Sequence, residues 1–339
     1  MPGSYYDQQA LLAALTRHWA GRFHNPARLE QLHRNVLVGG RHLALPIDEY
    51  EKLDSFDASN GAWIRCAVEL GERAVGDALA RAGLEPDAID HLFFVSVTGI
   101  AAPSIDARLV NRMGLRPDVK RTPIFGLGCV AGAAGIARAA DYLRAFPDQV
   151  AVLLSVELCS LTLQRGDLSI ANLIASGLFG DGAAAVVLTG GERAVRGPRV
   201  VATRSVFYPG TEHLMGWEIG SNGFRVVLSG DVPQVAGGIR KDVDAFLASQ
   251  GLVLADVDRF LCHPGGPKVL EAFETALELP REALGLTWKS LREVGNLSSA
   301  SVLFVLGDTL AERPAEPGSF GLMIAMGPGF CSELVLLQW

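Results

Sequence analysis

The stretch Gly128-Cys129-Val130-Ala131-Gly132 contains the cysteine on which the predicted fold and function of this chain depend. A cysteine lies between two glycines, at the point where the small residues of 130–146 predict the start of a helix. Free N–H groups and the dipole at a helix start favour a thiolate, and flanking glycines let a substrate come close. A lone cysteine is more often a small core residue. The glycines and the helix start favour a nucleophile at Cys129, whereas the other four cysteines are expected in the core.

Two further polar residues lie in similar small-residue settings. His263 follows an apolar strand-like run and precedes Pro264-Gly265-Gly266-Pro267, a turn that leaves space around the ring. Asn296 lies in Gly295-Asn296-Leu297-Ser298-Ser299. The alternatives are a structural histidine and an ordinary helix N-cap. A thiol, an imidazole and a carboxamide can together form an acyl enzyme, transfer a proton and stabilise an oxyanion.

The overall composition excludes several classes of protein. A chain of 339 residues with 49% hydrophobic content supports a large core, in one large domain or two fused ones. The net charge of −7 argues against nucleic-acid binding. Five cysteines without a CxxC pair argue against a disulfide framework or a metal site. The sequence shows no signal peptide and no apolar run of membrane-spanning length, so we expect a cytoplasmic protein.

Strand-like and helix-like segments alternate along the chain. The strand-like segments are continuously apolar, as strands buried on both faces should be. They cover residues 91–98, 150–156, 183–189, 258–262, 320–326 and 333–337. Helical patterns cover residues 61–82, 130–146, 239–249, 267–277 and 298–311. This alternation predicts an α/β protein.

The two halves of the chain resemble each other. Residues 83–93 match residues 251–261 at one constant offset, and the Cys129 segment matches the Asn296 segment at nearly the same offset. We therefore predict an internal duplication, with the seam in the Gly-, Arg- and Pro-rich residues 190–198. Residues 1–194 would form the half with the nucleophile, and residues 195–339 the half with the histidine and asparagine. Chance similarity of α/β units is the alternative.

Together with Leu178-Phe179-Gly180-Asp181-Gly182-Ala183 and Gly327-Pro328-Gly329-Phe330, these motifs resemble the bacterial type III polyketide synthases of the chalcone and stilbene synthase superfamily. The resemblance covers about residues 25–339. Ketoacyl synthase III enzymes share the fold, but their motif is His-Gln-Ala-Asn where this chain has His-Pro-Gly-Gly. The resemblance implies a thiolase-like five-layered αβαβα fold, a homodimer, and acyl-CoA and malonyl-CoA as substrates. It implies no permanently bound cofactor and no metal.

The resemblance also implies roles for single residues. Cys129 would carry the acyl group, and His263 and Asn296 would bind the thioester of malonyl-CoA. Phe179 and Phe224 correspond to two gatekeepers between the CoA tunnel and the reaction cavity. The remaining substrate-binding positions would be Cys159, Thr162, Ser298, Ala102, Gly327, Pro328 and Gly329, with Ala102 on a loop that reaches toward the partner subunit. The CoA-binding cations would be Arg28, Arg34 and Lys268.

The leading hypothesis is a synthase that starts from an acyl-CoA, expected to be a fatty acyl-CoA, and extends it with malonyl units. The product would be an alkylpyrone or alkylresorcinol. The alternatives are a ketoacyl synthase III-like single condensation in fatty acid synthesis, a cysteine thioester hydrolase, and a non-catalytic scaffold. Relatives have a longer lead-in than residues 1–7, so the first strand of the fold is expected to be missing.

Overall fold

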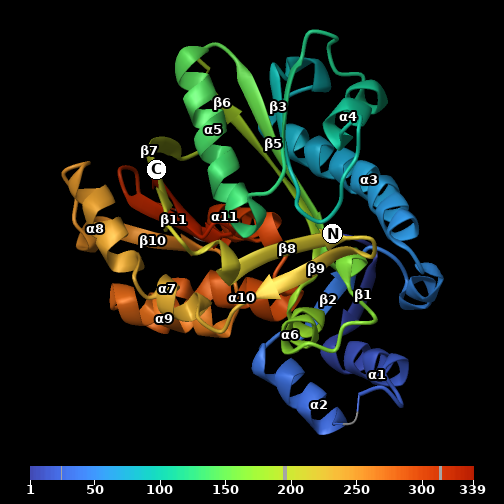
Figure 1. The fold of residues 1–339 in the computed structure, drawn as a ribbon. Coiled ribbons are helices and arrows are strands. Elements are labelled where there is room, and N and C mark those ends of the chain that lie inside the picture. Colours follow the sequence, from blue (N-terminus) through green and yellow to red (C-terminus); the bar gives the residue numbers. More distant parts are fainter. Residues whose placement is uncertain (24, 194–196, 313–314) are drawn as a thin grey trace.

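Two four-stranded sheets form the centre of the computed structural model, which describes residues 1–339 except 24, 194–196 and 313–314 (Figure 1). The first sheet has the order β4 (Lys120–Ile124), β3 (His91–Val95), β5 (Val150–Leu158), β6 (Asp181–Thr189). The second has the order β10 (Val257–Cys262), β11 (Phe320–Gly327), β12 (Cys331–Gln338), β7 (Arg199–Phe207). Strand β5 is buried at every position, as its continuous apolar pattern predicts.

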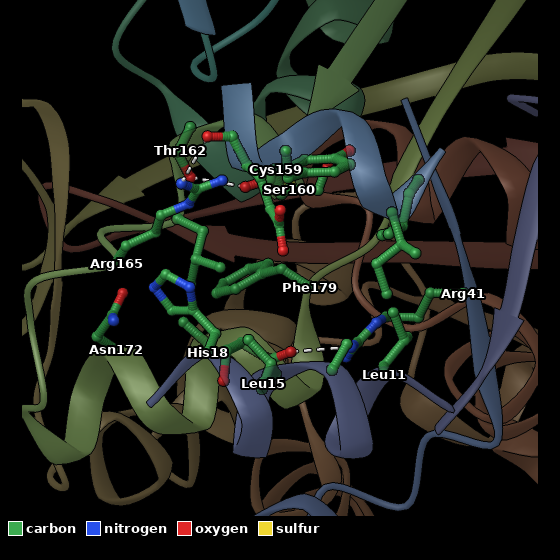
Figure 2. A pocket seen from close by; sticks show the side chains of 18 of the residues that line it. Leu11, Leu15, His18, Arg41, Cys159, Ser160, Thr162, Arg165, Asn172 and Phe179 are labelled. Atoms are coloured by element: carbon green, nitrogen blue, oxygen red, sulfur yellow. Dashed lines mark hydrogen bonds between the residues drawn. The ribbon is translucent and has the colours of Figure 1, made fainter. Parts of the chain in front are cut away.

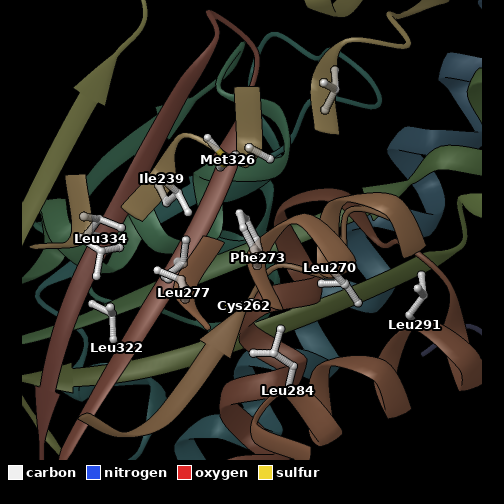
Figure 3. Close-up of a cluster of buried hydrophobic side chains, with 14 of the residues drawn as sticks. Ile239, Cys262, Leu270, Phe273, Leu277, Leu284, Leu291, Leu322, Met326 and Leu334 are labelled. Carbon is white, nitrogen blue, oxygen red and sulfur yellow. The ribbon is translucent and has the colours of Figure 1, made fainter. Parts of the chain in front are cut away.

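Helices cover both sheets and fill the space between them. The middle layer holds α5 (Ala131–Ala145) and α11 (Ser301–Glu312), and its core joins side chains of both sheets. The outer face of the first sheet packs on α3 (Phe56–Ala82) and α4 (Ile105–Met113). The outer face of the second sheet packs on α8 (Ile239–Ala248), α9 (Pro267–Leu277) and α10 (Gly285–Val294), around the apolar cluster in Figure 3. The expected five-layered αβαβα fold is confirmed.

The two sheets repeat one pairing pattern. Strand β3 pairs parallel with β5, which pairs antiparallel with β6. Strand β10 pairs parallel with β11, which pairs antiparallel with β12. This correspondence supports the proposed duplication. The boundary at residues 194/195 falls on residues 194–196, outside the described part of the chain.

A smaller group of elements lies beside the two sheets (Figure 1). It contains helices α1 (Gln8–His18), α2 (Pro26–Asn35) and α6 (Ile170–Leu178), and the hairpin of β8 (Met215–Gly220) and β9 (Gly223–Leu228), whereas the short helix α7 (Val232–Ala236) packs on α9. Strand β1 (Ser4–Asp7) forms at the start of the chain and pairs antiparallel with β2 (Gly40–Leu43). Within the described residues, no helix combines the length and the apolar character needed to cross a bilayer.

Candidate active site

Cys129 lies in a short 3₁₀ turn, Gly128–Val130, directly before α5. Its side chain is buried, with 7% exposed. The thiol donates a weak hydrogen bond to the Ser298 hydroxyl, with Sγ and Oγ 3.8 Å apart. Ser298 begins the corresponding 3₁₀ turn, Ser298–Ala300, before α11. The N-termini of α5 and α11 therefore lie close to each other.

Asn296 links the region around Cys129 to the loop that follows His263, residues 263–266. Its backbone N–H donates to the Leu178 carbonyl at 2.9 Å, and its carbonyl accepts from the Gly180 N–H at 3.0 Å. The carboxamide Nδ2 donates to the Gly265 carbonyl at 3.2 Å, two residues after His263. A hydrogen bond from Asn296 to the sulfur also lowers the pKa of Cys129. The fold thus brings the cysteine and the asparagine together, with the histidine loop beside them.

His263 directly follows strand β10, whose last two residues are buried, and the histidine is itself 3% exposed. The backbone is fixed, because its N–H donates to the Ile324 carbonyl at 2.8 Å. Neither ring nitrogen has a hydrogen-bond partner among the described residues. Burial lowers the pKa of the imidazole to about 3, so the ring is neutral and both nitrogens remain available to a ligand.

The expectation that the helix start and His263 would make Cys129 a thiolate is wrong for this structure. Burial, assisted by the charge of Glu157, raises the pKa of the Cys129 thiol to about 12. The hydrogen bonds from Ser298 and Asn296 act in the opposite direction but are outweighed. Since the imidazole is neutral, no charge there compensates the burial. The thiol and the imidazole are therefore both neutral in the unliganded protein.

Two cavities meet at Phe179. The His263 cavity, of about 500 Å³, is lined by His263, Asn296, Lys268 and Phe179. The Cys159 cavity, of about 310 Å³, is lined by Cys159, Thr162 and Phe179 (Figure 2). Because Phe179 lines both cavities, it occupies the position between them that a gatekeeper requires. Cys129 itself is not among the described residues that line either one.

Phe224, the second expected gatekeeper, lies in a different setting from Phe179. Its side chain is buried, with 3% exposed, in an aromatic group with Phe56, Phe125 and Trp217. It lines a third cavity of about 640 Å³, which adjoins the Cys159 cavity through shared residues such as Tyr50 and Ser160, and it is not among the described residues that line the two cavities at Phe179. Val226, two residues along the same strand, lines the Cys159 cavity instead. Phe224 and Val226 lie on the same face of β9, one further along the strand than the other. The sequence did not indicate which of the two side chains reaches the cavity.

The Gly327-Pro328-Gly329 turn packs against the nucleophile and does not line either cavity. A Cβ atom on Gly327 would lie 2.7 Å from the backbone nitrogen of Val130. The turn therefore supports the Cys129 backbone from the second half of the chain. Ala102 lies on an exposed loop and lines none of the three cavities.

Only one of the three expected CoA-binding cations reaches a cavity. Lys268 begins α9 and lines the His263 cavity. Arg34 lies on the exposed face of α2, where its guanidinium forms an ion pair with Glu30 at 2.5 Å. Arg28, on the same helix, donates to the Gln31 side chain at 3.4 Å. Helix α2 borders the His263 cavity through its apolar face, so neither arginine lines it.

A buried carboxylate near the thiol was missed in the sequence. Glu157 lies in β5 and is fully buried; it accepts from the Val97 N–H at 3.1 Å, from the Thr98 hydroxyl at 2.9 Å and from the Ser299 hydroxyl. An acidic residue inside a continuous apolar strand was the available signal, because unpaired carboxylates are almost never buried. Arg41, considered below, was also missed, because the polar segment Gly40–Leu43 gives no sign that its arginine is buried. Among the described residues, no group of three or more His, Cys, Asp or Glu side chains is placed to hold a metal ion.

Comparisons with known proteins agree on the class that this fold and site define. Residues 49–192 match the N-terminal domain of the chalcone and stilbene synthases, and residues 199–339 match the C-terminal domain. The chain therefore belongs to the chalcone and stilbene synthase family, whose bacterial members include type III polyketide synthases, and it is an acyl-transferring enzyme that uses CoA thioesters.

Individual relatives are similar over most of the chain. A 1,3,6,8-tetrahydroxynaphthalene synthase from Streptomyces peucetius subsp. caesius is 56% identical over 320 residues, 92% of this chain and 84% of the relative. A putative chalcone synthase from Bacillus subtilis is 39% identical, over 92% of this chain and 89% of the relative. The crystal structure of 1,3,6,8-tetrahydroxynaphthalene synthase from Streptomyces coelicolor A3(2), a bacterial type III polyketide synthase, superposes with a TM-score of 0.95 at 32% identity, covering 100% of this chain and 96% of that one.

Proposed function

We propose that Cys129 carries the growing chain and that His263 and Asn296 drive decarboxylative condensation. In loading, the sulfur attacks the carbonyl of an acyl-CoA, the C–S bond to CoA breaks, and CoA leaves with the thiol proton. The unpartnered imidazole is the group placed to move that proton. Transfer from a neutral thiol to a neutral imidazole creates the charged pair only when substrate is present.

In extension, the malonyl-CoA thioester carbonyl would accept hydrogen bonds from His263 and Asn296. Loss of CO₂ leaves an electron pair on the neighbouring carbon, delocalised onto that oxygen as an enolate. Donors aimed at the developing oxyanion lower the barrier. The enolate carbon attacks the Cys129 thioester, a carbon–carbon bond forms, and the Cys129 thiolate leaves. The observation that supports this assignment is that His263 and Asn296 line one cavity, while Asn296 also hydrogen-bonds the Cys129 sulfur.

We further propose malonyl-CoA as the starter as well as the extender, with a polyhydroxylated aromatic product. The 56% identical relative is named for 1,3,6,8-tetrahydroxynaphthalene, whose ring carbons correspond to five two-carbon units. The Cys159 cavity, of about 310 Å³, has room for a molecule of that class. Its wall includes the polar side chains of Arg41, Ser160 and Thr162.

A fatty acyl starter, with an alkylpyrone or alkylresorcinol product, is the second candidate. It is favoured by the apolar part of the same wall, formed by Leu11, Ala14, Leu15, Leu43, Ile47, Leu163 and Val226. An aliphatic chain gains about 0.8 kcal/mol for each CH₂ group that it buries there.

One incubation series tests both candidates. The protein is given malonyl-CoA alone, or malonyl-CoA with octanoyl- or palmitoyl-CoA, and the products are analysed by mass spectrometry. An aromatic product from malonyl-CoA alone supports the first candidate, and alkylated products only with the long starters support the second. Cys129→Ala should lose acyl loading in intact-protein mass spectra, and His263→Ala should lose CO₂ release. Full condensation by His263→Ala would contradict the roles assigned here.

We also propose that two copies of the chain associate through the edge of the first sheet, in a reducing compartment such as the cytoplasm. Strand β4 is the edge strand, and the adjoining loops expose Phe125 by 49% and Ile100 by 43%. An exposed edge flanked by apolar side chains is typical of an association surface. Light scattering should give the mass of a dimer, and Phe125→Glu should shift it toward the monomer. A monomeric wild-type protein would contradict the proposal.

A further inference from the structure

Arg41 places a buried positive charge in the wall of the Cys159 cavity. The side chain is 2% exposed and comes from β2. Its Nη2 donates to the Ser176 carbonyl at 2.8 Å, whereas Nε and Nη1 have no hydrogen-bond partner among the described residues. Burial lowers the pKa of the guanidinium to about 10, so the group remains charged at neutral pH. Buried donors without partners destabilise a fold unless a ligand or water meets them.

No carboxylate among the described residues hydrogen-bonds the Arg41 guanidinium directly. Asp181 is the carboxylate whose charge acts on Arg41, but its oxygens accept from the Ala44 N–H at 2.5 Å, the Ser160 N–H at 2.8 Å and the Ser160 hydroxyl. The charges of Arg41 and Asp181 act on each other without a direct hydrogen bond between the two side chains in the described part of the chain. His33, also nearby, has its pKa lowered to about 4 by burial and by Arg41, so it adds no charge at neutral pH.

The backbone of the active site holds the Arg41 side chain in place. A Cβ atom on Gly295 would lie 3.2 Å from Arg41 Cδ, and one on Gly180 would lie 3.4 Å from Arg41 Cβ. Gly295 directly precedes Asn296, and Gly180 directly follows Phe179. In Figure 2, Arg41 lies at one end of the cavity and Thr162 at the other, with Phe179 between them. The charge therefore lies in the cavity just beyond the residue that separates it from the condensing site.

We propose that Arg41 binds the free carboxylate at the far end of a chain that starts from malonyl-CoA, and thereby selects that starter. The inference rests on the function proposed above. A malonyl group bound to Cys129 through its thioester carries a carboxylate at its other end. Each extension inserts two carbons between the thioester and that carboxylate, so the charged end moves away from Cys129. Guanidinium groups bind carboxylates through charge-assisted hydrogen bonds, which are stronger than neutral ones.

Anchoring both ends would also shape the product. A chain held by the Cys129 thioester at one end and by Arg41 at the other is restricted to folded conformations. Restricting two reacting groups in this way raises their effective concentration for ring closure. A fatty acyl starter has no terminal charge, so it gains nothing from Arg41 and leaves the guanidinium unpaired. Arg41 is thus a specificity residue that acts on the starter and not on the condensation step.

The test is a competition between starters. The wild-type protein and the variants Arg41→Met and Arg41→Lys receive malonyl-CoA together with hexanoyl-CoA, and the ratio of malonyl-only to hexanoyl-started products is measured. Arg41→Met should lower this ratio by at least ~10-fold, because a charge-assisted contact is lost. Arg41→Lys should keep it within about threefold, because the charge remains. A ratio that is the same in all three proteins overturns the inference.

A second pair of variants covers the case in which Arg41→Met does not fold. Ala175 also lines the Cys159 cavity and directly precedes Ser176, whose carbonyl binds Arg41. Ala175→Asp would supply a competing carboxylate and should lower the ratio, whereas Ala175→Asn has the same size without the charge and should keep it. Equal ratios in the two Ala175 variants overturn the inference. A wild-type protein that makes no polyketide from either starter overturns the proposed function itself.

Discussion

A Cβ atom on Gly128 would lie 2.7 Å from the Cδ atom of Pro328. The residue before the nucleophile is therefore pressed against a turn that lies some 200 residues later in the chain, at the end of β11. Gly128 also has φ +55°, a left-handed conformation that costs a residue with a side chain about 1–2 kcal/mol. Both facts show why glycine is needed at this position and how the second half of the chain fixes the position of the thiol.

Gly128→Ala should therefore destabilise the protein and displace Cys129. The methyl group has no space, since Pro328 is rigid, and the backbone conformation becomes strained. We expect a loss of about 2–4 kcal/mol in the free energy of unfolding, measured by urea denaturation. Gly76→Ala is the matched control, because Gly76 lies inside helix α3 with nothing within 4 Å of its Cβ position. That control should gain about 0.5–1 kcal/mol. Equal effects in the two variants would refute the argument.

Phe179→Ala should join the two cavities. Loss of the ring that lines both removes the barrier between them, so we expect a wider range of product lengths in mass spectra. Phe224→Ala provides the contrast, because that ring packs among Phe56, Phe125 and Trp217. Its removal should cost about 3–5 kcal/mol of stability without changing the product pattern. A change of products in Phe224→Ala alone would restore the gatekeeper role to Phe224.

Glu157→Gln should make Cys129 more reactive. The charge of Glu157 raises the pKa of the thiol, so its removal should lower that pKa and increase the thiolate fraction. We expect alkylation of Cys129 by iodoacetamide at pH 8 to accelerate roughly two- to fivefold, measured by peptide mass mapping. Glu333→Gln is the control, since Glu333 raises the pKa of Cys331 and not that of Cys129. No difference between the variants at Cys129 would show that burial alone sets its pKa.

The buried His263 predicts acid lability. Its pKa is about 3 in the folded protein and about 6.5 in the unfolded chain, so the unfolded state binds the additional proton between these values. Stability should therefore fall as the pH decreases from 6.5 toward 3. His263→Asn removes this contribution, and its free energy of unfolding should change less between pH 7 and pH 4.5, by about 1–3 kcal/mol. The same pH dependence in both proteins would mean that His263 is solvated.

Lys268 should contribute to binding of the CoA thioester. It is the expected CoA-binding cation that lines the His263 cavity. Lys268→Ala should raise the KM for malonyl-CoA about three- to tenfold, with a smaller effect at high salt. Arg34→Ala should change it less than about twofold, because Arg34 is exposed and already paired with Glu30. Steady-state kinetics at two ionic strengths would distinguish the two variants. A larger effect of Arg34→Ala would indicate that CoA binds along helix α2 and not at Lys268.

The sequence predicted the fold class from local patterns, and the approach of Cys129 and the Asn296 segment from the similarity of the two halves. Continuous apolar strands alternate with helices, and Cys129 and Asn296 each precede a helix that packs in the middle layer. The motif order along the chain also indicated the family, which the matched domains confirm.

The protonation states and the cavity walls depend on three-dimensional burial, which the local sequence does not express. The helix start at Cys129 suggested a thiolate, but desolvation outweighs it. Phe224 and Val226 lie on one strand, and only the tertiary packing decides that Val226 reaches the Cys159 cavity. The unpaired charge of Arg41 depends in the same way on contacts with distant segments.

The Cys159 cavity takes part of its wall from residues 11–48, which precede the region matched by the family domains at residue 49. The groups assigned to bond making come from other segments, at positions 129, 263 and 296. Part of the shape of the cavity is therefore encoded outside the segments that carry the reacting groups. Exchanging the first 48 residues among related synthases would be a direct route to new ring systems with an unaltered reaction centre.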